Sequence, residues 1–267
     1  MARSPLFPGQ SARRPPWRWA TAGALLGALA MLVLSAPAAW LAAAVAAATH
    51  EQVLLLEARG TVWDGSARLV LSGGAGSRAR ASLPGRVHWQ GRPGATALHL
   101  ALSADCCTRA PLGLRLAPRW SGAALQVTDG QSDWPATMLT GLGTPWNTLQ
   151  IEGQLTLRTQ GLSVEWFSGR LAMGGTAEVA AIGLSSRLST LKPMGSYRIT
   201  VTGGATPMLA ITTLEGSLQL SGSGQWVGSR LRFQGEARAT AEHEAALSNL
   251  LNVMGRRRGA RSLITVG

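Results

Sequence analysis

The stretch Ile211–Gly235, ITTLEGSLQLSGSGQWVGSRLRFQG, decides the fold class of this 267-residue chain. Leu214, Gly216, Leu218 and Leu220 alternate there with polar residues. Alternation with a period of two is typical of a β-strand that buries one of its faces. We therefore interpret this stretch as part of a β-sheet with one apolar and one polar face.

A turn and a second strand are predicted to follow within the same stretch. The cluster Ser221–Gly224 is rich in turn-forming residues. Alternation resumes where Leu231 and Phe233 lie between polar neighbours. The stretch thus predicts a long amphipathic hairpin.

The same unit occurs earlier in the chain. The run Ile151–Leu157 matches Leu214–Leu220 position by position, IEGQLTL against LEGSLQL. Each copy continues to a Gly, a Trp, another Gly and an Arg-Leu pair, and looser copies of the Trp-x-Gly step occur at Trp63–Gly65 and Trp120–Gly122. Repeated amphipathic hairpins build a sheet by adding strands side by side. We therefore predict a mainly β fold, a curved, repetitive and mostly antiparallel sheet.

If both hairpins belong to one sheet, their apolar residues form a continuous strip. An exposed strip larger than a few hundred Å² is unusual in a monomer and marks a binding site. We expect helices of the same chain to cover it. The predicted strip consists of Ile151, Leu155, Leu157, Leu171 and Met173 from the first copy and Leu214, Leu218, Leu220, Leu231 and Phe233 from the second.

Further strand signals, separated by Gly and Pro, fill the rest of the exported part. A short helix is predicted at 136–142, with Asp133 as its N-cap before Pro135. The predicted strands are 53–56, 68–71, 87–89, 98–102, 112–116, 123–127, 149–159, 163–166, 171–173, 178–181 and 197–202.

The C-terminal region predicts an amphipathic helix. After Ala239 the apolar residues recur at three- and four-residue spacing, which is typical of a helix with one apolar face. We expect this helix to cover part of the apolar face of the sheet, and Ser262–Val266 to form a final edge strand. The apolar positions are Ala246, Leu247, Leu250, Leu251 and Met254.

The N-terminal region predicts one transmembrane helix. Residues 19–39 carry no charge, and about 20 apolar residues cross a bilayer. Tryptophans, which favour membrane interfaces, flank this run, and three arginines precede it. Because positively charged flanks stay on the cytoplasmic side, the N-terminus is predicted to be cytoplasmic.

We predict a cytoplasmic tail at 1–19, a transmembrane helix at 20–39, a helical linker at 40–52 and a periplasmic β-rich domain at 53–267. The alternative is a cleaved signal peptide, since Ala36-Pro37-Ala38 offers small residues at a suitable spacing. The apolar run is longer than the usual signal core of roughly 7–15 residues, which favours the anchor. In either case the chain after residue 40 is exported.

The formal net charge of +12 is concentrated at the two ends of the chain. Four arginines precede residue 19 and four lie in 256–261, so 17 of the 25 basic residues remain against 13 acidic ones. A nucleic-acid-binding protein would present a basic face together with base-reading or stacking residues. None is visible, and we predict no nucleic acid partner. The run Arg256–Arg258 is interpreted as a solvated helix end, with a partner acid or lipid phosphate as the alternative.

Cys106 and Cys107 are the only cysteines. An exported protein can form disulfides, but adjacent cysteines pair with each other only through a strained eight-membered ring. We favour unreacted thiols in a turn, with a vicinal or intermolecular bond as the alternatives. Two cysteines alone do not make a zinc site.

No catalytic constellation is visible in the sequence. His50, His88, His99 and His243 are isolated along the chain, and His88 and His99 are expected to point to solvent from strands. There is no nucleophile elbow, phosphate loop or Rossmann glycine run. We predict that the protein is not an enzyme, with no catalytic, cofactor-binding or metal-binding residues and no cofactor.

The Trp-x-Gly steps are interpreted as structural, with Gly permitting a bend and Trp covering the backbone.

Together these features resemble the type II secretion system protein N family, an inner-membrane component of the general secretion pathway in Gram-negative bacteria. The resemblance is carried by the anchor with Pro37, the step Gly60–Gly65 (GTVWDG), and Leu214–Gly235 continuing to Leu250–Arg257 (LLNVMGRR). It implies a periplasmic domain that contacts other components of the secretion system. The family offers no catalytic residues to carry over.

We keep one rival from a different functional class. A long sheet with a continuous apolar face also looks like the lipid-conducting grooves of AsmA-like envelope proteins. Under that alternative the protein carries lipid acyl chains along its apolar face. Closure of the face by the chain's own helices would favour the scaffold.

Overall fold

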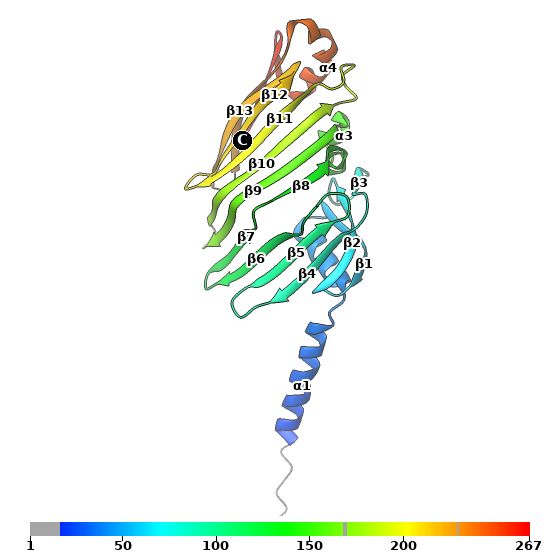
Figure 1. Cartoon of the computed structure of the whole chain (residues 1–267), viewed down its shortest axis with the longest axis vertical. Coiled ribbons are helices and arrows are strands. Elements are labelled where there is room, and N and C mark those ends of the chain that lie inside the picture. The colour runs from blue at the N-terminus through cyan, green and yellow to red at the C-terminus, as the bar shows by residue number, and fades with distance from the viewer. Residues whose placement is uncertain (1–16, 168–169, 229) are drawn as a thin grey trace, which may run out of the picture. The chain divides into compact units, whose positions relative to one another are not determined.

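The computed structural model describes residues 17–167, 170–228 and 230–267, and the chain divides into two compact units, 1–36 and 37–267. The first unit contains α1 (Trp17–Leu34), and the second contains all the other elements (Figure 1). Most of the predicted cytoplasmic tail, residues 1–16, lies outside the described residues.

Helix α1 carries an apolar sequence with its side chains exposed on every side. Leu25, Leu26 and Met31 are each 65% exposed or more. The helix ends at Leu34, so it is shorter than the predicted span 20–39, and α2 (Ala38–Ala48) follows after a break at Pro37. A proline disfavours the helical conformation in the residue before it, which explains the break. Among the residues that the structure describes, no helix combines the length and hydropathy required to cross a membrane.

The second unit is built on one antiparallel sheet, as the sequence predicted. Two of its strands, β9 and β10, are 16 residues long. The described strands are β1 (Val53–Gly60), β2 (Asp64–Ser72), β3 (Arg80–Ser82), β4 (Val87–Pro93), β5 (Leu98–Ala104), β6 (Leu112–Arg119), β7 (Gly122–Val127), β8 (Gly130–Pro135), β9 (Glu152–Phe167), β10 (Arg170–Ser185), β11 (Gly195–Gly204), β12 (Met208–Gly216), β13 (Leu218–Val227), β14 (Arg230–Ala239), β15 (Arg256–Arg258) and β16 (Arg261–Val266).

Strand order follows the chain closely. The order is β1-β2-β4-β5-β6-β7-β9-β10-β11-β12-β13-β14-β16-β15, with β3 paired to β2 and β8 paired to β9. Strand β9 joins the two halves of the sheet, because β7 pairs with its C-terminal part and β8 with its N-terminal part. The sheet therefore grows by successive hairpins, as the internal repeat predicted.

The two repeat copies correspond to the hairpins β9–β10 and β13–β14. In both copies the tryptophan, Trp166 in β9 and Trp226 in β13, lies one residue before the end of its strand, and the Arg-Leu pair begins the return strand. The looser copies lie at the β1–β2 and β6–β7 turns. The Trp-Gly steps are therefore a mark of hairpin turns in this chain.

The predicted turn at Ser221–Gly224 is wrong, because these residues lie within β13. Gly222 and Gly224 are opposite Gly235 and Phe233, and a Cβ at Gly222 would collide with the Phe233 ring. The glycines make room for an aromatic ring across the strands rather than for a turn.

The predicted strand Leu214–Leu220 is also interrupted. Strand β12 ends at Gly216 and β13 begins at Leu218, so the chain reverses between them. Gly216 has a φ of +115°, and a Cβ there would collide with the backbone of Met194 and Gly195. Glycine alone tolerates both this conformation and this approach.

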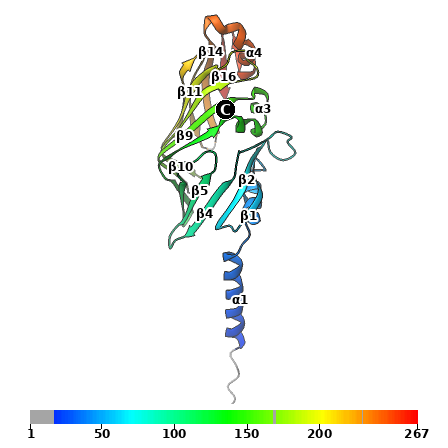
Figure 2. The same cartoon turned by 45° about the vertical axis from the view of Figure 1, so that its right-hand side comes forward.

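Four helical segments accompany the sheet of the second unit besides α2. They are η1 (Ala136–Leu142), α3 (Trp146–Leu149), η2 (Ala241–His243) and α4 (Glu244–Met254). Figure 2 shows α3 and α4 on the same side of the sheet.

The short helix at 136–142 is as predicted, but its predicted N-cap is wrong. Asp133 lies in β8, where its carboxylate accepts a hydrogen bond from the Thr156 hydroxyl at 2.8 Å.

The final strands also differ from the prediction. The run Arg256–Arg258 forms the edge strand β15 instead of a helix end. Strand β16 pairs with both β14 and β15, so the predicted edge strand is an interior one.

Three clusters of buried residues form the core, and the face that carries them is called the inner face below. The largest contains residues of β10, β11, β13 and β14 together with Leu247, Leu250 and Leu251 of α4. A second joins Met138 of η1 to β5 and its neighbours. The third places Ala38 of α2 against Ala67 and Trp89.

Candidate functional surfaces

The inner face holds an apolar cavity of about 340 Å³ between the sheet and α4. Apolar side chains of α3, α4 and β9–β14 line it, including Trp146, Ile151, Met194 and Met254. Leu250, 1% exposed, closes it from α4. The chain's own helix therefore covers the region where the predicted strip is widest.

Helix α4 covers the sheet because its apolar residues lie on one side. Leu247, Leu250 and Leu251 are at most 1% exposed, and their spacing of three and four places them on one helix face. The Arg257 guanidinium, from β15, donates to the Ser248 carbonyl at 3.3 Å and pairs with Glu244 at 3.3 Å. These contacts reach the first residue and the middle of α4, so Arg257 fixes the edge strand along the side of the helix.

Tyr197 is a buried residue of this core whose hydroxyl forms a hydrogen bond to the backbone. Its side chain is 2% exposed, and its hydroxyl donates to the Leu218 carbonyl at 2.9 Å. Burial raises the pKa of Tyr197 well above its usual value, because the phenolate would lose its hydration. The hydrogen bond holds the first residue of β13 directly after the tight β12–β13 turn.

The predicted apolar strip is confirmed in part. Ile151, Leu218 and Phe233 are buried at 8%, 2% and 7% exposure. Leu155 and Leu220 pack against the largest cluster. Leu214 is 42% exposed because the reversal at Gly216 places it outside that core, so its assignment to the strip is wrong. The side chain of Leu171 lies outside the described side chains.

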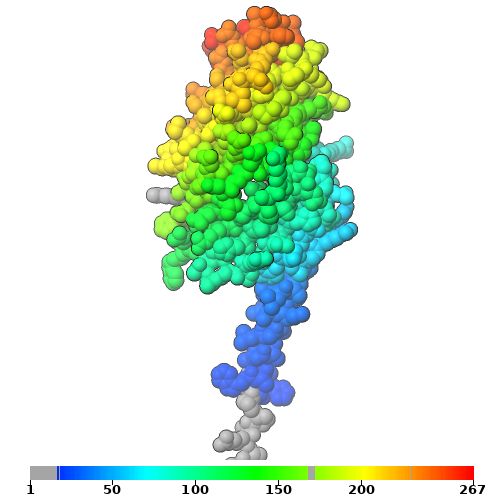
Figure 3. Space-filling view, viewed as in Figure 1, coloured from blue at the N-terminus to red at the C-terminus, as the bar shows by residue number. Residues whose placement is uncertain are grey.

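The outer face of β4, β5 and β6 carries a row of three basic side chains, Arg92, His99 and Arg115, called the cation row below. Arg92 is directly opposite His99, and His99 is directly opposite Arg115. All three residues are exposed. In the space-filling view the teal and green strands β4 to β7 are exposed on the visible face (Figure 3).

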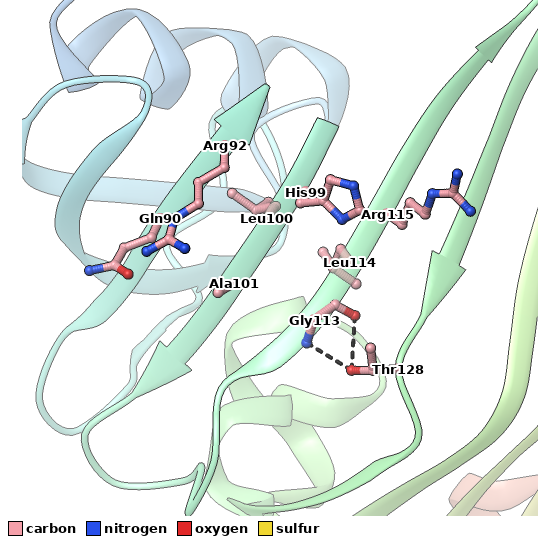
Figure 4. A pocket seen from close by; sticks show the side chains of 9 residues that line it. All are labelled: Gln90, Arg92, His99, Leu100, Ala101, Gly113, Leu114, Arg115 and Thr128. Carbon is pink, nitrogen blue, oxygen red and sulfur yellow. Dashed lines mark hydrogen bonds between the residues drawn. The ribbon is translucent and has the colours of Figure 1, made fainter. Parts of the chain in front are cut away.

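A shallow pocket of about 330 Å³ lies beside the cation row (Figure 4). Gln90, Ala101 and Gly113 form a second cross-strand row next to it. The Thr128 hydroxyl accepts from the Gly113 N–H at 2.9 Å and donates to the Gly113 carbonyl at 3.1 Å. Because the residues at 101 and 113 are small, the bottom of the pocket lies below the level of the basic side chains beside it.

Some exposed arginines elsewhere on the sheet are paired with carboxylates on a neighbouring strand, whereas others, such as Arg232 and Arg238, are in no ion pair of the described residues. Arg198 pairs with Glu178 at 3.3 Å and Arg261 with Glu236 at 3.6 Å. Over the described residues, no ion pair includes a member of the cation row. The Arg115 guanidinium donates a long hydrogen bond to the Gln126 amide oxygen at 3.4 Å.

The cysteines form a vicinal disulfide, so the favoured prediction of two unreacted thiols is wrong. The pair lies in the turn after β5, where the Cys107 carbonyl accepts from the Asp133 N–H at 2.8 Å. The Thr108 hydroxyl bonds both backbone groups of Ala104 across this turn. Cys107 is buried in the second core cluster, so the turn is part of the packing between β5 and β8.

His88 and His99 are exposed on strands, as predicted. His88 Nε2 lies 3.0 Å from the Asp105 carboxylate. The Arg86 backbone N–H donates to the same carboxylate at 2.9 Å and, with His88, holds the pKa of Asp105 below its usual value. Within the described ranges, no three His, Cys, Asp or Glu side chains gather as metal ligands.

The predicted covering of the backbone by the tryptophan of each Trp-x-Gly step is not general. At the Trp63–Gly65 step the covering ring comes from outside the predicted steps: Trp89, 2% exposed, lies against Gly65 and donates to the Thr61 carbonyl at 3.1 Å. Trp120 and Trp166 are exposed at their hairpin turns, so they leave the adjacent backbone uncovered.

A family model described as type II secretion system (T2SS), protein N, matches residues 51–264. The chain belongs to this family. No curated protein and no solved structure matches the chain significantly. The match covers nearly all of the second unit, so the sheet described above is a fold of the protein N family.

Sequence reasoning missed the cation row. Its three members are far apart in sequence, at 92, 99 and 115, and only strand register brings them together. Pro93-Gly94, a turn signal, separates the first two members and could have placed Arg92 opposite His99.

Proposed function

We propose that this protein is an inner-membrane-anchored component of the type II secretion system whose sheet domain lies in the periplasm and serves as a scaffold or contact surface. The family match over 51–264 carries the assignment to the secretion system. Partners are therefore other components of that system.

The proposal of a membrane anchor rests on α1. A helix whose apolar side chains are exposed on every side needs an apolar environment, and a bilayer supplies one. Arginines precede the helix and residues 19–39 carry no charge. This asymmetry supports a cytoplasmic N-terminus and a periplasmic sheet domain.

Closure of the inner face supports a scaffold. Leu247, Leu250 and Leu251 pack over β13 and β14, Leu250 closes the apolar cavity there, and α2 and η1 cover the other half of the sheet. The comparisons give no support to the AsmA-like alternative. The surfaces left for partners are the outer face and the hairpin turns.

Topology is tested with reporters that are active only in the periplasm. A reporter fused after Gly267 should be active, and one fused before Met1 should be inactive. A soluble product that begins between Ala38 and Ala48 would show cleavage and overturn the anchor.

Partners are tested by crosslinking in the cell. A photoreactive residue placed at exposed Gln219, on the outer face, should capture secretion-system components. The matched control is the same residue at buried Leu247, which should capture none. Equal capture from both positions would contradict the contact surface.

A further inference from the structure

We propose that the pocket beside the cation row is a docking groove for an acidic, extended segment of a partner protein. The inference rests on the proposed function only in taking the partner to be a protein. It adds the surface and the chemistry that the partner presents.

The groove has one basic side and a flat floor. Arg92, His99 and Arg115 stand in direct cross-strand register along one side. Direct neighbours on adjacent strands have Cβ atoms about 5 Å apart, so the row spans roughly 10 Å. Ala101 and Gly113 provide the floor in the adjacent row.

The cation row opposes like charges when His99 is protonated. Arg92 and Arg115 each stand directly opposite His99 and are two strands apart from one another. A protonated His99 then has a guanidinium group as its direct neighbour on each side, and like charges directly opposite one another on a sheet are destabilising. The nearby acids are engaged or displaced from the row. Asp105 binds His88 and the Arg86 N–H, and Asp129 accepts from the Gly161 N–H at 2.6 Å.

Two further acids, Asp64 and Glu165, lie on the strands around the cation row. Asp64 is directly opposite Gln90, in the cross-strand row beside the cation row, and no ion pair of the described residues joins it to a member of the row. Glu165 lies on β9, two strands away from Arg115. It is paired with Ala124, and the direct partner of Arg115 on β7 is Gln126. Glu165 therefore lies on another cross-strand row and leaves the cation row unneutralised. The charge that is absent within the chain fits a partner that supplies carboxylates.

The directions of the side chains favour a peptide over a single small anion. Figure 4 shows the guanidinium of Arg92 on the Gln90 side and that of Arg115 on the opposite side of His99. A single phosphate would require convergent donors, whereas separated donors fit separate carboxylates. An extended chain rises about 3.3 Å per residue, so acids two or three residues apart match the spacing of the row.

Binding of a synthetic peptide to the detergent-solubilised full chain tests the groove. The probe is a fluorescent Asp-Ser-Asp-Ser-Asp-Ser peptide, and fluorescence anisotropy measures its affinity. The double variant Arg92→Gln/Arg115→Gln should lose at least ~10-fold in affinity, since two charge-assisted contacts are removed. An Asn-for-Asp peptide should not bind.

The matched control removes two other outer-face charges. Arg232→Gln/Arg238→Gln changes the net charge equally on β14, where both arginines are exposed. It should change the affinity less than ~3-fold. Equal losses of affinity in the two double variants would show that the peptide responds only to the net charge of the protein. That result would overturn the groove. Inorganic phosphate, added at constant ionic strength, should not displace the peptide. Displacement would overturn the peptide as the occupant of the groove.

A second variant separates binding from folding. His99→Glu places a carboxylate between two guanidinium groups, as in the ion pairs found elsewhere on the sheet. It should raise the melting temperature and abolish peptide binding. A lower melting temperature would contradict the charge repulsion on which the inference depends.

Failure of this inference and failure of the proposed function are distinguishable. Peptide binding in solution does not depend on secretion, so its loss in the row variants supports the groove even if no secretion component is captured in cells. Capture of components by a chain with an inactive groove would support the proposed function and overturn the groove.

Discussion

The two halves of the sheet share an alternating strand pattern but differ in how each face is completed. In β9–β14 the inner face carries one large cluster closed by α4, and the outer face carries the ion-paired Arg198 as well as exposed arginines such as Arg232 and Arg238. In β1–β7 the inner face carries two smaller clusters, and the outer face carries the cation row. The larger cluster indicates that β9–β14 provides most of the stability of the sheet, whereas β4–β6 is distinguished by three basic side chains in direct cross-strand register.

The largest expected effect tests the core of β9–β14. Leu218→Asp would bury a carboxylate among apolar side chains and should lower the free energy of unfolding by about 4 kcal/mol or more. Chemical denaturation of the purified chain measures it. Gln219→Asp, on the exposed side of the same strand, should stay within about ±0.5 kcal/mol. Equal effects would show that the inner and outer faces are misassigned.

A slightly smaller effect is expected in the other half. Trp89→Ala removes a buried ring and its hydrogen bond to the Thr61 carbonyl, and should cost about 3 kcal/mol. Hydrogen exchange should show faster exchange in β2, β4 and β5 while β10–β13 stay protected. Gln90→Ala is the exposed control. Uniform loss of protection would make the sheet one cooperative unit and remove the distinction between the halves.

Tyr197 gives a prediction with a defined pH dependence. Tyr197→Phe leaves the Leu218 carbonyl without its donor and should cost about 1–2 kcal/mol. Because burial raises the pKa in the folded state, the folded chain binds the phenolic proton more tightly than the unfolded chain. This difference in pKa stabilises the folded chain fully below pH 10, the pKa of tyrosine in the unfolded chain. The stabilisation is lost as pH rises above that pKa.

The titration of Tyr197 can be followed directly, because it is the chain's one tyrosine. Phenolate absorbance should appear only well above pH 10 or together with unfolding. A phenolate that forms at the ordinary pKa in the folded chain would contradict the burial.

The smallest expected effect concerns Asp105. The pKa of Asp105 is lowered in the folded state, mainly by the hydrogen bond from the Arg86 N–H. The ionised carboxylate therefore stabilises the folded chain above the unfolded pKa near 3.8, and this stabilisation is lost as pH falls through the lowered pKa. Asp105→Asn should therefore reduce stability slightly at neutral pH and remove a small part of the acid sensitivity. Thermal melts between pH 3 and pH 7 measure this. An unchanged pH profile would show that the exposed contacts contribute nothing.

Much of the fold followed from the sequence because alternation and repetition report strands directly. Every predicted strand from 53 to 127 lies within an observed one, and the repeat found two homologous hairpins. The turn positions did not follow, because glycine has two uses here. Gly222 accommodates the Phe233 ring within a strand, whereas Gly216 permits the reversal. Local sequence does not distinguish a glycine required for space from one required for its backbone conformation.

The surfaces were harder to predict than the fold. Pairing of Arg92 with His99 and Arg115 depends on register across three strands, which no local pattern specifies. The Cys106–Cys107 bond depends on a turn held by Thr108 and by the contact with Asp133. These are tertiary properties, and general expectations about adjacent cysteines gave the wrong result.

The edges of the sheet limit how copies of this protein can associate. At one edge, β15 places three arginines in succession, and Arg257 is held by α4. At the other edge, β1 is irregular between Leu56 and Arg59, where Glu57 has a φ of +51° and binds Arg68 and Arg86. Charged side chains and bulges prevent one strand edge from templating another. The charges and the irregularity at β15 and β1 therefore disfavour the extension of this sheet from one molecule into a neighbouring one, even at high local density.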